Sequence, residues 1–424
     1  MVRGNLKKNK SIKEVKDTIY LYVLQIVDKI TPLLIIPYLL ITLGAENYGY
    51  IGFATAIINY ILLFVEFGFN LSATQRIAVA KERNTEELSR IFFSTMVAKV
   101  FLFFIASLII LPIVFFVPSL RIYFETVLFM FPLVLGGVFG LGWFYQGIGK
   151  IRIAAIVISL SKILVLPMIF VFVNEPSDYN LAAFIQSFVY LFSSIVTFAI
   201  LYKMRVIKKT NVKLYDVNLE IKESFPLFLS SVATSMYTQL FTLILGFIST
   251  PTIVGKYSAA ERIMRSICFA IYSPISQAFY PKIASLAYTN KTKAKDLFHK
   301  LVLFMFVLMT ILSLSLFIFA KPIVNLLGND YTGLEILLRI MSFVPIAIAL
   351  GAIYGQMGLI AMGNNESKSK FKTVYFCAAS FSLIAVSVLA FLYQDIGASI
   401  ALLLTEYFVL FFMFRNYKRF SSCY

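Results

Sequence analysis

Apolar stretches of about 20 residues recur along the whole chain, and only short polar connectors separate them. A stretch of this length spans the hydrocarbon core of a bilayer as a helix. Of the 424 residues, 60% are hydrophobic and 14% are charged, against roughly 25% charged residues in soluble domains. The sequence therefore predicts an all-α polytopic membrane protein, and no connector is long enough to form a soluble domain.

We expect twelve transmembrane helices, which are 17–42, 46–70, 91–117, 122–146, 153–173, 181–202, 224–249, 257–281, 298–320, 334–362, 372–393 and 397–414. Of the 38 Lys and Arg, 29 lie in or at the edges of one set of alternate connectors, and three lie in the other set. Because cytoplasmic loops are enriched in Lys and Arg, both termini are expected in the cytoplasm. The net charge of +17 thus reports topology and does not indicate a nucleic-acid partner.

The longest connector divides the predicted spans six and six. We expect an N-terminal six-helix bundle (1–202), a basic cytoplasmic linker (203–223) and a C-terminal six-helix bundle (224–424). A shift of 206 residues aligns Gly49 with Gly255, and Arg76-Ile77-Ala78 with Lys282-Ile283-Ala284. These matches are weak, but their order indicates a parallel repeat, in which the first, second, seventh and eighth spans line a path between the halves.

The eighth predicted span contains three charged residues at membrane depth, Glu261, Arg262 and Arg265. Glu261 lies four residues before Arg265, which is the favourable order for an ion pair on a helix. One positive charge is then left over, and a guanidinium in a polar cavity suits a phosphate. The alternative is that Arg262 extends to the headgroups from its place about 8 Å from the outer end of the span.

Asp28 and Lys29 lie near the middle of the first span, where neither side chain easily reaches the membrane surface. They could face the same cavity, or pair with charges on other helices for packing alone. Lys162, near the middle of its span, is a further cavity candidate, and Glu406 is a candidate for proton or ion coupling. We expect Lys99 to reach the headgroups, Glu66 to anchor or cap a helix end, and Trp143 to belong to an interfacial aromatic belt.

Several kinds of site have no counterpart in the sequence. Cys268, Cys377 and Cys423 have no metal or disulfide spacing, and His299 is the single histidine. There is no phosphate-cradling glycine loop that ends in Gly-Lys-Ser/Thr. We therefore expect a protein that is not an enzyme and that has no metal and no cofactor of its own.

Five segments in order along the chain carry a family resemblance. They are Leu43-Gly44 with Tyr48-Gly49, Glu66-Phe-Gly-Phe-Asn-Leu-Ser-Ala-Thr-Gln-Arg76, Trp143-Phe-Tyr-Gln-Gly147, Gly255-Lys-Tyr-Ser-Ala-Ala260 and Phe279-Tyr-Pro-Lys-Ile283. Together with twelve spans they resemble the Wzx-type O-antigen or lipid-linked oligosaccharide flippases. That family lies within the multidrug/oligosaccharidyl-lipid/polysaccharide exporter superfamily. The family usually has Asp where this chain has Glu66, and Phe where it has Tyr145. Both substitutions are conservative, since the first keeps a carboxylate and the second keeps an aromatic ring.

The resemblance implies a multi-pass protein of the bacterial cytoplasmic (inner) membrane, built as a V-shaped pair of six-helix bundles. It implies movement of an undecaprenyl-pyrophosphate-linked oligosaccharide, such as an O-antigen repeat unit, from the cytoplasmic to the periplasmic leaflet. It further implies a cation-lined cavity and coupling to a proton or sodium gradient. A polysaccharide polymerase and a chain-length regulator are the candidate protein partners.

The resemblance also implies roles for the charged residues at membrane depth. Lys29, Arg262, Arg265 and Lys162 would bind the pyrophosphate, and Asp28, Glu261 and Glu406 would balance charge or couple an ion. The candidates for sugar contact on the four lining spans are Gln25, Asn59, Tyr237, Gln239 and Gln277.

Two other functions compete with this interpretation. A multidrug or organic-cation antiporter of the same superfamily would need an acidic cavity, whereas the charged lining spans hold a small excess of cations. A membrane-embedded polymerase or ligase of surface glycans would need a sizeable outer loop, which this chain lacks.

Overall fold

The computed structural model describes residues 2–421 of the chain. It describes their side chains except those of residues 2–30, 83, 230, 233, 234, 236, 237, 365 and 421. Every regular element in this described part is helical, which confirms the all-α class. Gln25, Asp28, Lys29 and Tyr237, four of the predicted site residues, lie outside the described side chains.

The first half of the chain holds the elements from α1 to α9. They are α1 (Val2–Glu66), α2 (Phe69–Arg83), α3 (Thr85–Phe116), α4 (Pro118–Arg121), α5 (Phe124–Phe129), α6 (Phe131–Val138), α7 (Gly142–Gly147), α8 (Ile151–Phe172), the 3-10 turn η1 (Pro176–Asp178) and α9 (Tyr179–Met204). The second half holds α10 (Leu214–Ile248), α11 (Pro251–Thr289), α12 (Lys291–Leu327), the 3-10 turn η2 (Asn329–Tyr331), α13 (Leu334–Met341), α14 (Val344–Ala352), the π-helix η3 (Ile353–Ala361) and α15 (Asn365–Ser421).

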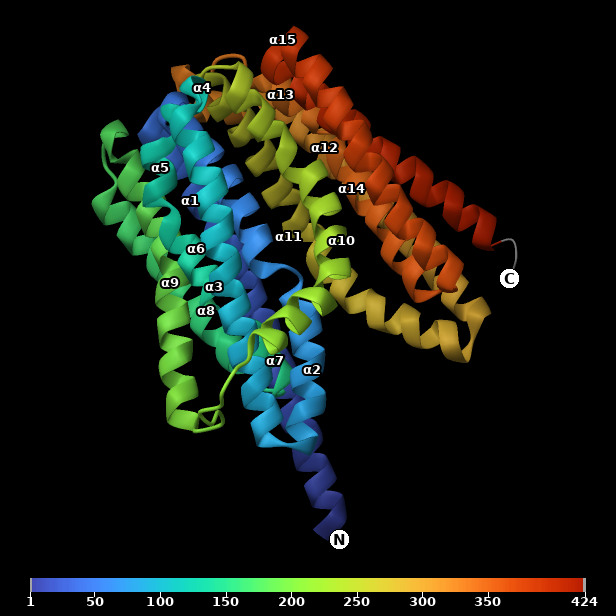
Figure 1. The fold of residues 1–424 in the computed structure, drawn as a ribbon. Coiled ribbons are helices and arrows are strands. Elements are labelled where there is room, and N and C mark those ends of the chain that lie inside the picture. Colours follow the sequence, from blue (N-terminus) through green and yellow to red (C-terminus); the bar gives the residue numbers. More distant parts are fainter. Residues whose placement is uncertain (1, 422–424) are drawn as a thin grey trace.

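Two of these helices each combine a pair of predicted spans. α1 contains the non-helical residue Gly44 (φ 74°, ψ 173°), and α15 contains Gln394 (φ 51°, ψ −124°). The chain reverses direction at both places (Figure 1). By length and apolar composition, eight segments of the described chain qualify as membrane spans. The total of twelve crossings and the cytoplasmic position of both termini stay predictions.

Large apolar side chains cover the outward faces of the long helices. On α3, Phe104 is 64% exposed and Leu108 is 77% exposed. On α12, Leu303, Ile311 and Ile318 are also exposed. A continuous apolar surface of this kind is rare on soluble monomers and is expected where helices face lipid. This surface agrees with the polytopic membrane fold.

The helices form two groups that meet at one end (Figure 1). The groups are closest at the end where α4 and α13 lie, and they are apart at the opposite end, near α2 and the start of α12. The V-shaped arrangement implied by the family resemblance is therefore present. The predicted boundaries of the two bundles and of the linker remain predictions.

Glycines allow α1 and α11 to approach closely where the two groups meet. A methyl group on Gly49 would overlap the carbonyl oxygen of Pro251, and one on Gly255 would overlap that of Ala45. The two overlapping pairs are related by the same shift of 206 residues that aligns the halves of the sequence. The contact between the halves therefore follows the predicted repeat.

Candidate functional site

A polar cavity of about 380 Å³ lies between α1 of the first half and α10 and α11 of the second half. Its wall includes Thr55 and Asn59 of α1 and Gln239 of α10. α11 contributes Glu261, Arg262, Arg265 and Ser266. Spans two, seven and eight thus line a common space, as the repeat predicts.

Arg262 faces the interior of the molecule. Its Nη1 donates a hydrogen bond of 3.2 Å to the Tyr48 hydroxyl, and its guanidinium carbon lies 5.9 Å from the centre of the Tyr48 ring. Among the described side chains, Arg262 forms no ion pair with a carboxylate. The alternative in which Arg262 reaches the headgroups is therefore wrong, because its side chain points inward to Tyr48 and the cavity.

Arg265 has carboxylate partners on two helices. Its Nε donates to Glu261 Oε1 at 2.8 Å, which confirms the predicted pair four residues apart. Its Nη2 also lies 3.8 Å from Oε1 of Glu406, a residue of α15 that is 4% exposed. Arg262, Arg265, Glu261 and Glu406 therefore sum to zero formal charge. Glu406 therefore offsets the one positive charge that remains when Glu261, Arg262 and Arg265 are counted together.

A second cavity of about 320 Å³ adjoins the first along Arg262 and Ser266. Its other walls come from α1, α8 and α9, and they include Thr31, Lys162, Gln186 and Tyr190. Lys162 Nζ lies 6.0 Å from the centre of the Tyr190 ring, within the range of a cation–π contact. Lys162 and Arg262 thus share one cavity wall, although they come from different halves.

A third cavity, of about 550 Å³, lies inside the first group of helices. Lys99 lines it, is 1% exposed and donates from Nζ to the Gly137 carbonyl oxygen at 2.9 Å. Trp143 is 2% exposed and lines the same cavity. The predicted roles of Lys99 at the headgroups and of Trp143 in an aromatic belt are therefore wrong, because both side chains are buried by neighbouring helices. Glu66 also lines this cavity.

The candidates for sugar contact separate into three sets. Asn59 and Gln239 line the cavity between the halves. Gln277 is exposed and lines none of the three cavities. Gln25 and Tyr237 are outside the described side chains, as are Asp28 and Lys29.

Two tyrosines that shape these cavities are not site candidates from the sequence. Tyr48 belongs to one of the motifs that carry the family resemblance, and in the structure it is the hydrogen-bond partner of Arg262. Tyr190 lines two cavities. Neither role follows from the local sequence, because the partners come from helices distant in the chain.

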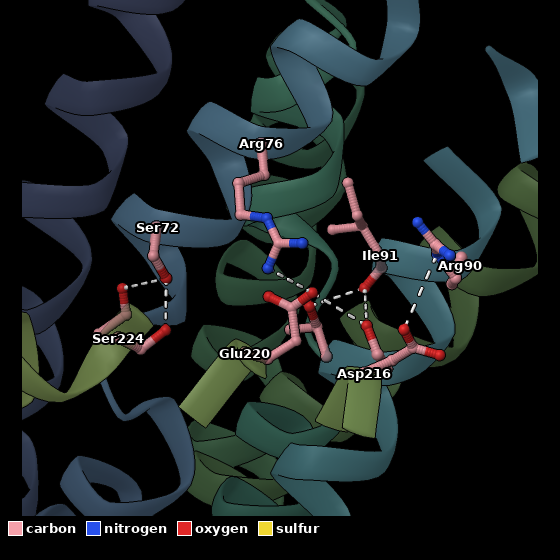
Figure 2. Close-up of polar contacts among 10 residues, drawn as sticks. Ser72, Arg76, Arg90, Ile91, Asp216, Glu220 and Ser224 are labelled. Atoms are coloured by element: carbon pink, nitrogen blue, oxygen red, sulfur yellow. Dashed lines mark hydrogen bonds and ion pairs between the residues drawn. The ribbon is translucent and has the colours of Figure 1, made fainter. Parts of the chain in front are cut away.

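A buried polar cluster joins α2 and α3 to the start of α10 (Figure 2). Arg76 Nη1 lies 2.7 Å from Oε1 of Glu220, and the Ser94 hydroxyl donates to the same oxygen at 3.0 Å. The Ser72 and Ser224 hydroxyls are 2.5 Å apart. Burial raises the pKa of the Glu220 carboxyl above its usual value, and the Arg76 guanidinium offsets this only in part.

The same cluster determines how α2 is held. Residues Phe69–Arg83 form α2, which begins three residues after the end of α1 at Glu66. Arg90 and Asp216 form a more exposed pair at 4.0 Å beside the cluster. Through Arg76, α2 is fastened to the first turns of α10.

The described residues contain no group of three or more His, Cys, Asp or Glu that could hold a metal ion. The site consists of cations, carboxylates, hydroxyls and amides around cavities that share wall residues. Such a set can bind and orient a polar or anionic molecule.

Comparison with known proteins gives consistent similarities. A family model described as polysaccharide biosynthesis protein matches residues 15–287. A protein of Escherichia coli (strain K12) named "Putative O-antigen transporter" is 34% identical over 407 residues, which covers 95% of this chain and 97% of the relative.

Two solved structures share the fold at low sequence identity. The lipid II flippase MurJ in an inward closed conformation matches with a TM-score of 0.73 and 15% identity, over 94% of this chain and 87% of MurJ. An inward-facing multidrug resistance transporter of the MATE family matches with a TM-score of 0.64 and 15% identity, over 93% of this chain and 96% of that one.

Proposed function

The chain belongs to the polysaccharide biosynthesis protein family, and from this premise we propose that it is a flippase for a lipid-linked oligosaccharide. The substrate would be an undecaprenyl-pyrophosphate-linked repeat unit of an O-antigen or a related surface glycan. It would move from the cytoplasmic to the periplasmic leaflet of the bacterial inner membrane. The name of the Escherichia coli relative supports this substrate class.

The position of Arg262 is the observation that carries the proposal. It is a guanidinium on the wall of two cavities between the halves, and it donates a hydrogen bond to a neutral group, the Tyr48 hydroxyl. A guanidinium can donate paired hydrogen bonds to phosphate oxygens, and it remains charged at all physiological pH values. A pyrophosphate bound beside Arg262 could also approach Lys162, which lines the same cavity.

The charge of the cavity walls favours an anionic substrate over an organic cation. The described cations on the three walls are Lys99, Lys162, Arg262 and Arg265. The carboxylates on or against these walls are Glu66, Glu261 and Glu406, and two of them contact Arg265. A multidrug antiporter, which is the competing proposal, would need the opposite balance to attract cations.

Transport would follow alternating access, with the halves rocking about the α1–α11 contact. In the arrangement of Figure 1 the halves are apart at the end predicted to face the cytoplasm. The pyrophosphate would bind between the halves in this state, while the lipid tail stays in the bilayer. Coupling to a proton or sodium gradient through Asp28 or Glu406 belongs to this proposal.

The test is complementation of a strain that lacks its own copy of the gene. Arg262→Ala and Lys29→Ala should abolish surface polysaccharide at unchanged protein abundance, because each removes a cation proposed to hold the pyrophosphate. Lys300→Ala is the matched control, since Lys300 pairs with Asp296 on the surface with 72% of its side chain exposed. Polysaccharide is measured by gel staining and protein by immunoblot.

A drug-susceptibility assay on the same strains separates the two functions. The flippase proposal expects no change in resistance to organic cations. Normal polysaccharide in both variants, or drug resistance that depends on the transporter, would contradict it.

A further inference from the structure

The cavity inside the first group of helices has the size of a ligand site. Its volume of about 550 Å³ lies within the range of roughly 300–1,000 Å³ that small-molecule sites occupy. Helices α1, α3, α6, α7, α8 and α9 all contribute to its wall. The polar side chains on the wall include Asn59, Asn70, Gln146, Ser193 and Thr197. The proposed binding of pyrophosphate at Arg262 does not require this third cavity.

Lys99 is the strongest indication that a polar ligand enters the cavity. Its side chain is 1% exposed and lines the wall, and burial of an ammonium group costs several kcal/mol unless polar partners surround it. An ammonium has three donors, and the Gly137 carbonyl accepts one of them. Among the described residues, Lys99 has no carboxylate within ion-pair distance, although Glu66 lies on the same wall.

Trp143 provides a second and independent indication. Its indole Nε1 is buried and has no hydrogen-bond partner among the described residues. A buried donor without a partner costs about 1–3 kcal/mol, so a ligand oxygen that accepted from it would be favoured. Next to it, Gly142 leaves open space, since no atom would lie within 4 Å of an added Cβ.

The cavity shares wall residues with the two cavities that Arg262 lines. Asn59 lines both this cavity and the 380 Å³ cavity. Tyr190 lines both this cavity and the 320 Å³ cavity that contains Arg262. A molecule with an anionic group at Arg262 could therefore extend past Asn59 and Tyr190 into the first group of helices.

We propose that this cavity binds the sugar residues of the lipid-linked oligosaccharide, with Lys99 donating hydrogen bonds to sugar oxygens. The inference rests on the proposed flippase function and adds where the glycan lies and what holds it. The carrier pyrophosphate and the glycan then occupy separate subsites. Gln146, an exposed amide on the same wall, is a second contact.

The test compares two probes on the purified full-length protein in lipid nanodiscs. The first is farnesyl pyrophosphate, which has a pyrophosphate and an isoprenoid tail but no sugar. The second is the lipid-linked repeat unit extracted from cells of the source strain that lack the transporter. Lys99→Met should weaken binding of the glycosylated probe about tenfold, the loss expected for one charge-assisted hydrogen bond, and should leave farnesyl pyrophosphate within about twofold.

Three further variants make the result interpretable. Gln146→Ala should act in the same direction as Lys99→Met and changes an exposed side chain, so it guards against misfolding of the lysine variant. Arg262→Gln should weaken both probes. Lys300→Met removes a surface ammonium and should change neither.

The outcomes distinguish the failure of this inference from failure of the proposed function. If the wild-type protein binds neither probe, the flippase proposal fails and the inference fails with it. If the wild-type protein binds both probes equally well, or if Lys99→Met and Gln146→Ala affect both probes alike, the glycan subsite is wrong while the flippase proposal stands.

Discussion

Two arginines three residues apart on α11 have different surroundings. Arg265 contacts Glu261 on its own helix and Glu406 on α15. Arg262 contacts the Tyr48 hydroxyl of the other half and borders two cavities. The geometry therefore separates a mainly structural arginine from one that is available to a ligand.

This difference predicts different effects of the same substitution. Arg265→Gln should lower the free energy of unfolding by about 3 kcal/mol, because it leaves the buried Glu406 and the partly buried Glu261 without their cation. Arg262→Gln should cost less than about 1 kcal/mol, because the hydrogen bond that it removes has a neutral partner and both carboxylates keep their contact with Arg265. Thermal and denaturant unfolding of the purified variants in detergent measures the difference.

A compensating variant provides the control for this prediction. Adding Glu261→Gln and Glu406→Gln to Arg265→Gln should restore much of the lost stability, since neither position 261 nor position 406 then carries a charge without its cation. Equal losses for the two single arginine variants would show that the ion pairs do not stabilise the fold.

The sequence could predict the local pair but not its third member. Glu261 and Arg265 lie one helical turn apart, so their contact follows from spacing alone. Glu406, Tyr48 and Lys99 acquire their partners only when helices distant in sequence pack together. Lys99 was misjudged for this reason, because its depth was estimated from the span while the helices that bury it were unknown.

At the scale of elements, the shift of 206 residues also relates helix caps and buried positions in the two halves, beyond the few identical residues. Asn84 caps the start of α3 by accepting from Glu86 N at 2.9 Å, and Asn290 caps α12 by accepting from Lys293 N at 3.0 Å. Ile77 of α2 and Ile283 of α11 are both fully buried. The repeat thus fixes corresponding helix ends and buried faces, which weak sequence matches could indicate only in outline.

Other elements could not be predicted from hydropathy. The predicted span 122–146 is interrupted, and it forms the short helices α5, α6 and α7. Near the inner end of the predicted span 334–362, residues Ile353–Ala361 form a π-helix. An apolar stretch indicates that the chain crosses the membrane, but the hydrogen-bond pattern within it depends on neighbouring helices.

The buried cluster between α2, α3 and α10 supports a prediction about how the halves are linked. Arg76→Met should lower the free energy of unfolding by about 2–3 kcal/mol, because Glu220 is 1% exposed and would lose its cation. Arg90→Gln should cost less than about 1 kcal/mol, because the Arg90–Asp216 pair is longer and more exposed. Unfolding in detergent followed by fluorescence compares the two variants.

Proteolysis gives a local measurement for the same cluster. If the ion pair holds the start of α10 against α2 and α3, trypsin should cut the basic 203–223 segment faster in Arg76→Met than in the wild type. Adding Glu220→Gln to Arg76→Met should slow the cutting again. Unchanged cutting with unchanged stability would mean that the cluster does not hold the segment.

At the scale of the whole molecule, the two halves depend on one glycine-lined crossing. Gly49 and Gly255 bring α1 and α11 together, and a Cβ on either would also lie 3.0 Å from the backbone nitrogen of the other. The obstructing atoms are backbone atoms, which cannot move aside as a flexible side chain could. The close end of the V in Figure 1 is therefore sensitive to a single methyl group.

We expect Gly49→Ala to open this crossing and to bring the opposite ends of the halves together. Spin labels on cysteines at Lys203 and Thr292, which are exposed near the separated ends of α9 and α12, would report the change. The native cysteines Cys268, Cys377 and Cys423 are replaced first. The distance distribution from pulsed electron paramagnetic resonance should gain a shorter population, and polysaccharide export should fall because one of the two transport states is disfavoured.

Gly351→Ala is the matched control, because the nearest atoms to an added Cβ lie at 3.6 Å or more, which is ordinary contact. It should leave both the distances and the export unchanged. A Gly49→Ala protein that folds and keeps the wild-type distance distribution would show that the α1–α11 crossing does not set the balance between the two states. Alternating access would then have to come from bending within the helices and not from rocking about the crossing. Helices bend at prolines, and α11 contains two of them, Pro274 and Pro281.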